Sequence, residues 1–230
     1  MIPYLSDFFN LFFPKICLIC SRALHMHEKH ICKLCERALP RSYFHMANHN
    51  PVEKLFWGRV NIEKASSYLL YTKESKVKNI LHSLKYRQQK ELGYELGKIY
   101  ARDLSEVNYF KNLDFIVPVP LHPRKFKERG YNQSEWIAKG LSEVLSVPLK
   151  TDLLFKSYHT STQTRKGRYQ RWENVEDVFN IVSGEKFEGC NILLVDDVLT
   201  TGATLEACAK KLKSIKDIKI NVATLAYASI

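Results

Sequence analysis

The chain has 230 residues, of which 45% are hydrophobic and 26% are charged, and its formal net charge is +11. This composition excludes an intrinsically disordered chain, and no apolar run approaches the roughly 18 residues that span a bilayer. The basic excess attracts polyanions, either a nucleic acid or a phosphorylated small molecule, and charge alone does not separate the two. The N-terminus lacks a basic region followed by a small-residue cleavage site, so we expect no secretory signal and a cytoplasmic location.

The first segment is a short apolar leader, with the sequence DFFNLFFP at residues 7–14. It is too short to cross a bilayer. We expect a short helix that docks onto its own domain. The alternatives are peripheral contact with the inner face of a membrane and insertion into a groove on a partner protein.

Four of the six cysteines form two Cys-x2-Cys pairs, and eleven residues separate the pairs: Cys17, Cys20, Cys32 and Cys35. Two such pairs supply four tetrahedral ligands for zinc, and metal binding can fold a module too small for its own core. We therefore expect an N-terminal unit, residues 1–45, that contains a structural zinc ribbon. Redox-active cysteine pairs are one alternative. The replacement of one thiolate by His25, His27 or His30 is another.

Hydrophobic periodicity after the ribbon predicts an α/β domain at residues 60–230, built on a parallel sheet. Strands are expected at 65–71, 115–120, 191–195 and 218–227, and helices at 76–84, 91–104, 133–145 and 203–213. Segment 41–60 has no clean periodicity and is interpreted as a linker or an irregular wrap. The residues after Pro120 are interpreted as a basic loop, and 156–175 carry too few apolar residues for a core element.

Segment 192–204, ILLVDDVLTTGAT, is the most specific pattern in the chain. A buried strand leads to two adjacent carboxylates, Asp196 and Asp197, which can accept hydrogen bonds from two neighbouring sugar hydroxyls. A turn at the start of a helix follows, where backbone N–H groups and the helix dipole favour a dianionic phosphate. We expect the two aspartates to bind a ribose, and the turn residues to bind its 5-phosphate: Thr200, Thr201, Gly202, Ala203 and Thr204. The alternative is an ordinary turn in which Asp and Thr cap the helix.

Two basic regions could assist this site. Pyrophosphate needs several fixed donors, and the candidates are Lys85, His122, Arg124 and Arg129. A solvated basic loop is the alternative for the last three. A second stretch, residues 160–174, is cationic and carries two aromatic residues. It is predicted to be a lid over the site or a contact for single-stranded DNA. Its candidate residues are Arg165, Lys166, Arg168 and Arg171.

Segment 192–204 closely resembles the signature of type I phosphoribosyltransferases, which bind phosphoribosyl pyrophosphate with Mg²⁺. The cysteine quartet, Pro118-Val119-Pro120, the sequence RGYNQS at 129–134, Thr162-Gln163-Thr164, and Arg171 with Asn174 and Phe179 extend the resemblance over nearly the whole chain. This combination resembles the ComF family, in which a four-cysteine zinc ribbon precedes a type I phosphoribosyltransferase domain.

The ComF resemblance implies the fold class, an α/β type I phosphoribosyltransferase-like parallel sheet with an N-terminal zinc ribbon. It also implies a role in natural transformation, with phosphoribosyl pyrophosphate and single-stranded DNA as ligands. A competence helicase or another DNA-uptake protein would be the partner. The alternative is an active Mg²⁺-dependent phosphoribosyltransferase with an unknown acceptor, because a fold does not establish a reaction.

Overall fold

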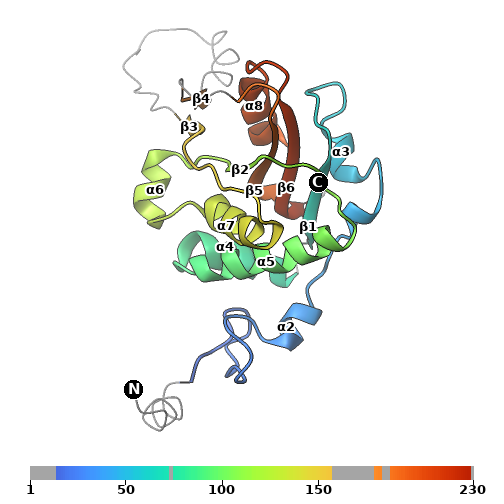
Figure 1. Ribbon diagram of the computed structural model, residues 1–230. Helices are drawn as coiled ribbons and strands as arrows, with labels where there is room; N and C mark the ends of the chain where they lie inside the picture. The colour runs from blue at the N-terminus through green and yellow to red at the C-terminus, as the bar shows by residue number, and fades with distance from the viewer. Residues whose placement is uncertain (1–13, 73–74, 157–178, 183–186, 229–230) are drawn as a thin grey trace.

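The computed structural model describes residues 14–72, 75–156, 179–182 and 187–228 (Figure 1). The cysteine-bearing module contains α2 (Lys33–Arg37), and a connecting segment contains η1 (Phe44–Met46) and α3 (Pro51–Lys54). The remaining elements follow in chain order: β1 (Ala65–Tyr71), α4 (Lys76–Tyr86), α5 (Lys90–Glu106), β2 (Phe115–Pro118), α6 (Pro123–Arg129), α7 (Gln133–Leu145), β3 (Leu154–Lys156), β4 (Phe179–Ile181), β5 (Asn191–Leu199), α8 (Ala203–Leu212) and β6 (Lys219–Ala228).

The central sheet has four strands in the order β1-β6-β5-β2, and every neighbouring pair is parallel. Parallel strands present their carboxyl ends at one edge of a sheet, where ligands of open α/β folds bind. The segments that follow β2 and β5 therefore meet at the same edge. Strands β3 and β4 form a separate antiparallel pair.

Helices cover both faces of this sheet, with α4, α5 and α7 on one side and α8 on the other (Figure 1). The alternation of side chains along β5 separates the two cores. Leu193 packs with Leu96 and Ile137 on the first side, whereas Leu194 packs with Leu205 on the second. All five side chains are at most 1% exposed. Burial of one such side chain contributes roughly 1.5–3 kcal/mol.

Helices α5 and α7 approach each other closely because glycines face each other at the contact. A Cβ atom on Gly140 would overlap the carbonyl oxygen of Tyr94, and one on Gly97 would overlap that of Ile137. This packing joins the middle of α7 to α5.

The predicted α/β architecture with a parallel sheet is confirmed, and most element bounds agree within one or two residues. We expected the basic segment after Pro120 to be a loop. This expectation is wrong, since residues 123–129 form the helix α6. Pro123 at the first turn, the His122 side chain that accepts from the Arg124 N–H, and Gly130 at a φ of 77° begin and end this short helix. Strands β3 and β4 were not predicted, because three-residue strands give little periodicity.

Of the two interpretations of segment 41–60, the irregular wrap agrees with the structure and the linker does not, because the segment packs into the large domain. Val52 and Phe56 are at most 1% exposed and join the core on the α8 side of the sheet. Asn50 caps α3 through the Val52 and Glu53 N–H groups.

The cysteine module packs on the α4–α5 side of the molecule. Cys17, Ile31 and Leu39 belong to the same buried cluster as Ile80 of α4. The apolar leader, apart from Pro14, lies outside the described residues. Among the residues that are described, no helix combines the length and the apolar character needed to cross a membrane.

Candidate functional site

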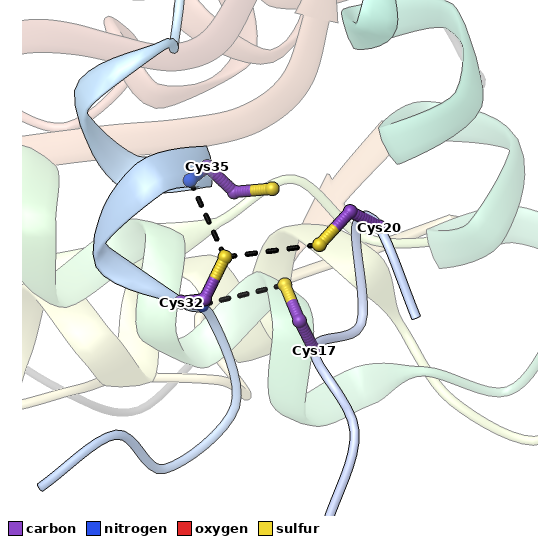
Figure 2. Close-up of side chains that lie close together, drawn as sticks. All are labelled: Cys17, Cys20, Cys32 and Cys35. Atoms are coloured by element: carbon purple, nitrogen blue, oxygen red, sulfur yellow. Dashed lines mark hydrogen bonds between the residues drawn. The ribbon is translucent and has the colours of Figure 1, made fainter. Parts of the chain in front are cut away.

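The four cysteine sulfurs converge on one point, with Cys17 and Cys20 on one loop and Cys32 and Cys35 at the start of α2 (Figure 2). All four sulfurs lie within 4.8 Å of one another, and those of Cys20 and Cys32 are 3.7 Å apart. Tetrahedral zinc with ligands at roughly 2.3 Å requires sulfurs about 3.8 Å apart. The cluster therefore has the size and the donor set of a four-thiolate metal site. The histidines at 25, 27 and 30 are not part of it.

Local hydrogen bonds lower the pKa of at least one of these thiols, Cys17. Burial raises the pKa of Cys17, but backbone N–H groups of Cys32, Cys20 and Ile19 outweigh burial and lower the pKa to about 7. Burial raises the pKa of the Cys35 thiol, and the neighbouring sulfurs add to the increase. Thiolates so close together need a cation between them, as a metal ion would provide.

Segment 192–204, which we call the phosphoribosyl loop, runs from the buried part of β5 to the turn before α8, at the carboxyl edge of the central sheet. Strand β5 continues to Leu199, beyond the expected end at residue 195, so that Asp196 and Asp197 belong to the strand. Gly202 is the N-cap of α8 at a φ of 79°, and no side chain caps the helix. The Thr201 hydroxyl lies 3.5 Å from the Ala203 N–H, which is a weak contact. Helix capping therefore does not explain the polar residues, and four residues of the turn are exposed: Thr200, Thr201, Ala203 and Thr204.

The two adjacent aspartates have different neighbours. The Asp197 carboxylate is 3.0 Å from the Lys85 ammonium group, at the last turn of α4. The Asp196 carboxylate accepts a hydrogen bond of 2.8 Å from the Ser134 hydroxyl, at the start of α7. Burial raises the pKa of Asp196 to about 7, and the negative charge of Asp197 contributes to the increase.

The RGYNQS segment, residues 129–134, fixes the surroundings of these carboxylates. The side chains of Tyr131 and Gln133 both donate to the Leu84 carbonyl oxygen, immediately before Lys85. Asn132 donates to the Val119 carbonyl oxygen at 2.9 Å, which joins the start of α7 to the end of β2. These bonds between segments position Lys85 and Ser134 on the two aspartates.

One contributor, Arg59, was missed in the sequence because it lies in segment 41–60, which was interpreted as a linker or an irregular wrap. Its guanidinium donates to the Thr201 carbonyl oxygen at 2.8 Å and pairs with Glu206 of α8. Arg59 therefore holds the phosphoribosyl loop from the outside. No local pattern identifies it, because Thr201 and Glu206 are far away from it in the sequence.

The pyrophosphate candidates have different positions. Lys85 contacts the loop directly, and His122 caps α6. Arg124 pairs with Glu128 at 3.4 Å, and its side chain is 84% exposed. Arg129 donates to Gln133 at 2.9 Å. The lid or DNA candidates Arg165, Lys166, Arg168 and Arg171 lie outside the described residues, so their roles stay predictions.

Comparison with known proteins gives the same architecture. A family model described as a phosphoribosyl transferase domain matches residues 132–229. Competence protein F of Haemophilus influenzae is 26% identical over 230 residues, which cover 94% of this chain and 99% of that protein. DNA utilization protein YhgH of Escherichia coli is 27% identical, with 86% and 83% covered. Competence protein ComFC of Bacillus subtilis is 29% identical, with 85% and 77% covered.

The match to competence protein F covers 94% of this chain, so it includes most of the N-terminal module and of the sheet domain. The described structure contains the two features that the family combines. One is a cluster of four cysteine sulfurs, and the other is a type I phosphoribosyltransferase sheet with its acidic strand end and glycine turn. The chain is a member of the ComF family.

Proposed function

We propose that this protein binds phosphoribosyl pyrophosphate with Mg²⁺, binds single-stranded DNA, and acts in DNA uptake during natural transformation. The observation that carries the proposal is the meeting of Lys85, Ser134, Asp196 and Asp197 beside the open turn before α8. The names of the curated relatives, competence proteins and DNA utilization proteins, support a role in competence. A DNA-uptake protein such as a competence helicase would be the partner.

Each part of the ligand has a suitable group at this edge of the sheet. Asp196 and Asp197 would accept the ribose hydroxyls, and the backbone donors of residues 200–204 would bind the 5-phosphate. Lys85 lies beside Asp197 and would turn its ammonium group toward the pyrophosphate. Mg²⁺, when bound with this ligand, neutralises part of the pyrophosphate charge.

The cysteine cluster would hold a structural zinc ion. Three of its four cysteines are at most 6% exposed, and the fourth, Cys20, is exposed. A site closed by four protein ligands leaves no open position for a substrate, which is typical of structural zinc. Its role would be to fold the module against the α4–α5 side of the large domain.

A second candidate function is phosphoribosyl transfer to an unknown acceptor, in which the protein is a glycosyltransferase. The observation that favours it is Asp196, because a carboxyl group with a pKa of about 7 can accept or release a proton near neutral pH. Pyrophosphate would be released in such a reaction.

Calorimetric titration of phosphoribosyl pyrophosphate with Mg²⁺, with and without single-stranded DNA, tests the ligand. We expect the double variant Asp196→Asn, Asp197→Asn to lose affinity strongly, because charge-assisted hydrogen bonds are worth about 1.5–3 kcal/mol each. A matched control is Asp152→Asn, which removes an exposed carboxylate that pairs with Lys150. Wild-type affinity in the double variant would contradict the proposal. Release of pyrophosphate only when an acceptor is present would establish transfer.

A further inference from the structure

A cluster of aromatic side chains lies on the surface next to the phosphoribosyl loop. Tyr86 at the end of α4 is 66% exposed, and Phe126 on α6 is 47% exposed. The ring of Trp136, on α7, is half-buried. Phe126, Arg129, Trp136 and Lys90 line a hollow of about 350 Å³ between these helices. None of the three rings belongs to the buried cores of the described residues.

Cations accompany these rings. The Arg129 guanidinium lies 5.6 Å from the centre of the Tyr86 ring and thus joins α6 to α4. Lys90 and Lys139 approach the Trp136 ring from two positions, at 4.8 Å and 5.0 Å. We call these three rings and three cations the α4–α6–α7 surface: Tyr86, Lys90, Phe126, Arg129, Trp136 and Lys139.

The chemistry of this surface matches a flexible polyanion that carries flat rings. Aromatic side chains can stack on any nucleobase, and nearby cations bind the phosphates between bases. The lysine stems are flexible, so that a base stacked on Trp136 can displace an ammonium group toward the adjacent phosphate. An acidic peptide would use the cations but would leave the exposed rings without a planar partner.

We infer that the α4–α6–α7 surface binds single-stranded nucleic acid by stacking bases on Tyr86, Phe126 and Trp136. This inference rests on the proposed function and assigns its DNA contact to described residues. Tyr86 directly follows Lys85, so the strand would pass along the pyrophosphate side of the phosphoribosyl loop.

The test is fluorescence anisotropy of the full chain with a labelled oligothymidylate of about 20 nucleotides, which exceeds the roughly 4–16 nucleotides of a single-domain site. Tyr86→Leu and Phe126→Leu keep an apolar side chain and remove the ring. Each should weaken binding roughly fivefold to a hundredfold, because one stacked base contributes about 1–3 kcal/mol. Trp57→Leu is the matched control, because Trp57 is 58% exposed and lines a different hollow, formed by residues between Glu53 and Ile62.

Salt dependence separates stacking from charge. Lys90→Gln and Lys139→Gln should flatten the plot of log affinity against log salt by about 0.7 per lost phosphate contact, whereas the ring variants should keep the slope. Lys216→Gln and Lys219→Gln, at exposed positions before and at the start of β6, should leave the slope unchanged. Thermal melting and metal content of each variant check that the fold is intact.

Several results would overturn the inference, and they differ in what they imply. If the wild-type chain binds the oligonucleotide and the ring variants bind it equally well, the surface is wrong although the DNA function holds. The surface would also be wrong, and the DNA function would also hold, if only a variant lacking Arg165, Lys166, Arg168 and Arg171 lost binding. A wild-type chain that does not bind the oligonucleotide would overturn the surface and the DNA function together. The last result is binding of a polyglutamate peptide to the wild-type chain. If the ring variants weaken that binding as much as they weaken binding of the oligonucleotide, the surface binds an acidic protein instead.

Discussion

Lys85 and Asp197 form an ion pair of 3.0 Å between the last turn of α4 and the end of β5. The side chains are 23% and 12% exposed, so water screens the pair only in part. The hydrogen bonds of Tyr131 and Gln133 to the Leu84 carbonyl oxygen hold this turn of α4 in place. In the proposed ligand complex, the pair would couple a cation for pyrophosphate to an acceptor for ribose.

Variants of this pair should separate the two ligand contacts. We expect Lys85→Met to weaken phosphoribosyl pyrophosphate binding about tenfold to a hundredfold, because a charge-assisted contact is lost. Ribose 5-phosphate, which has no pyrophosphate, should bind the Lys85→Met variant nearly normally, whereas Asp197→Asn should weaken both ligands. Calorimetry measures all four affinities. Lys78→Met, at an exposed position of α4, is the control.

The double variant of the pair adds a second criterion. Because each single change breaks the same ion pair, the loss in the double variant should be smaller than the two single losses combined. Fully additive losses would mean that Lys85 and Asp197 act independently on the ligand.

The raised pKa of Asp196 predicts how the stability of the ligand-free protein depends on pH. The pKa of about 7 in the folded state lies above the ordinary value of 3.8, so the folded state binds the extra proton between these limits. This contribution to stability is present at low pH and is lost as the pH rises toward 7. Asp196→Asn should remove that part of the dependence, which thermal melts of both proteins between about pH 5 and 7.5 would measure.

Ligand binding should respond to pH in the opposite direction. The ionised Asp196 carboxylate can accept hydrogen bonds from the Ser134 hydroxyl and from a ribose hydroxyl at the same time, whereas the protonated group must donate one. Affinity for the ribose should therefore rise as the pH increases through about 7. The same pH profile in the Asp196→Asn variant would assign the effect to the titration of the ligand phosphates.

The cysteine cluster should bind one zinc ion per chain. Cys32→Ser should lower the zinc content and loosen the module, because the Cys32 sulfur lies 3.7 Å from that of Cys20 and accepts from the Cys35 N–H. Elemental analysis and limited proteolysis measure these two effects. Cys190→Ser is the control, since Cys190 lies outside the cluster. Metal-free protein whose module resists proteolysis would contradict the zinc assignment.

The close contact between α5 and α7 should not tolerate a side chain. Gly140→Ala places a methyl group on the Tyr94 carbonyl oxygen and within 2.9 Å of the Lys98 nitrogen, and neither backbone atom can move freely. Overpacking of this kind costs on the order of 1–3 kcal/mol, which denaturant unfolding would detect. Gly93→Ala should be milder, because its nearest neighbour is the Leu84 side chain at 3.2 Å. Equal stability of the two variants would refute this account of the packing.

The sequence by itself determined the features that depend on neighbouring residues. Apolar spacing located α7 at 133–145 and β1 at 65–71, because helix and strand periods are local properties. The doubled Cys-x2-Cys pattern located the cysteine cluster, since each pair lies within a single short turn. Segment 192–204 was recognisable because its acids, glycine and threonines follow one another along the chain.

Only the tertiary structure decided which distant residues complete the site. The order β1-β6-β5-β2 places the end of β5 beside α4 and the start of α7, which brings Lys85 to Asp197 and Ser134 to Asp196. The same packing brings Arg59 to Thr201, although the residues around Arg59 show no regular pattern. Such contacts depend on strand order and on the packing of helices against the sheet. Local periodicity carries no information about either, because it depends only on residues within a few positions of one another.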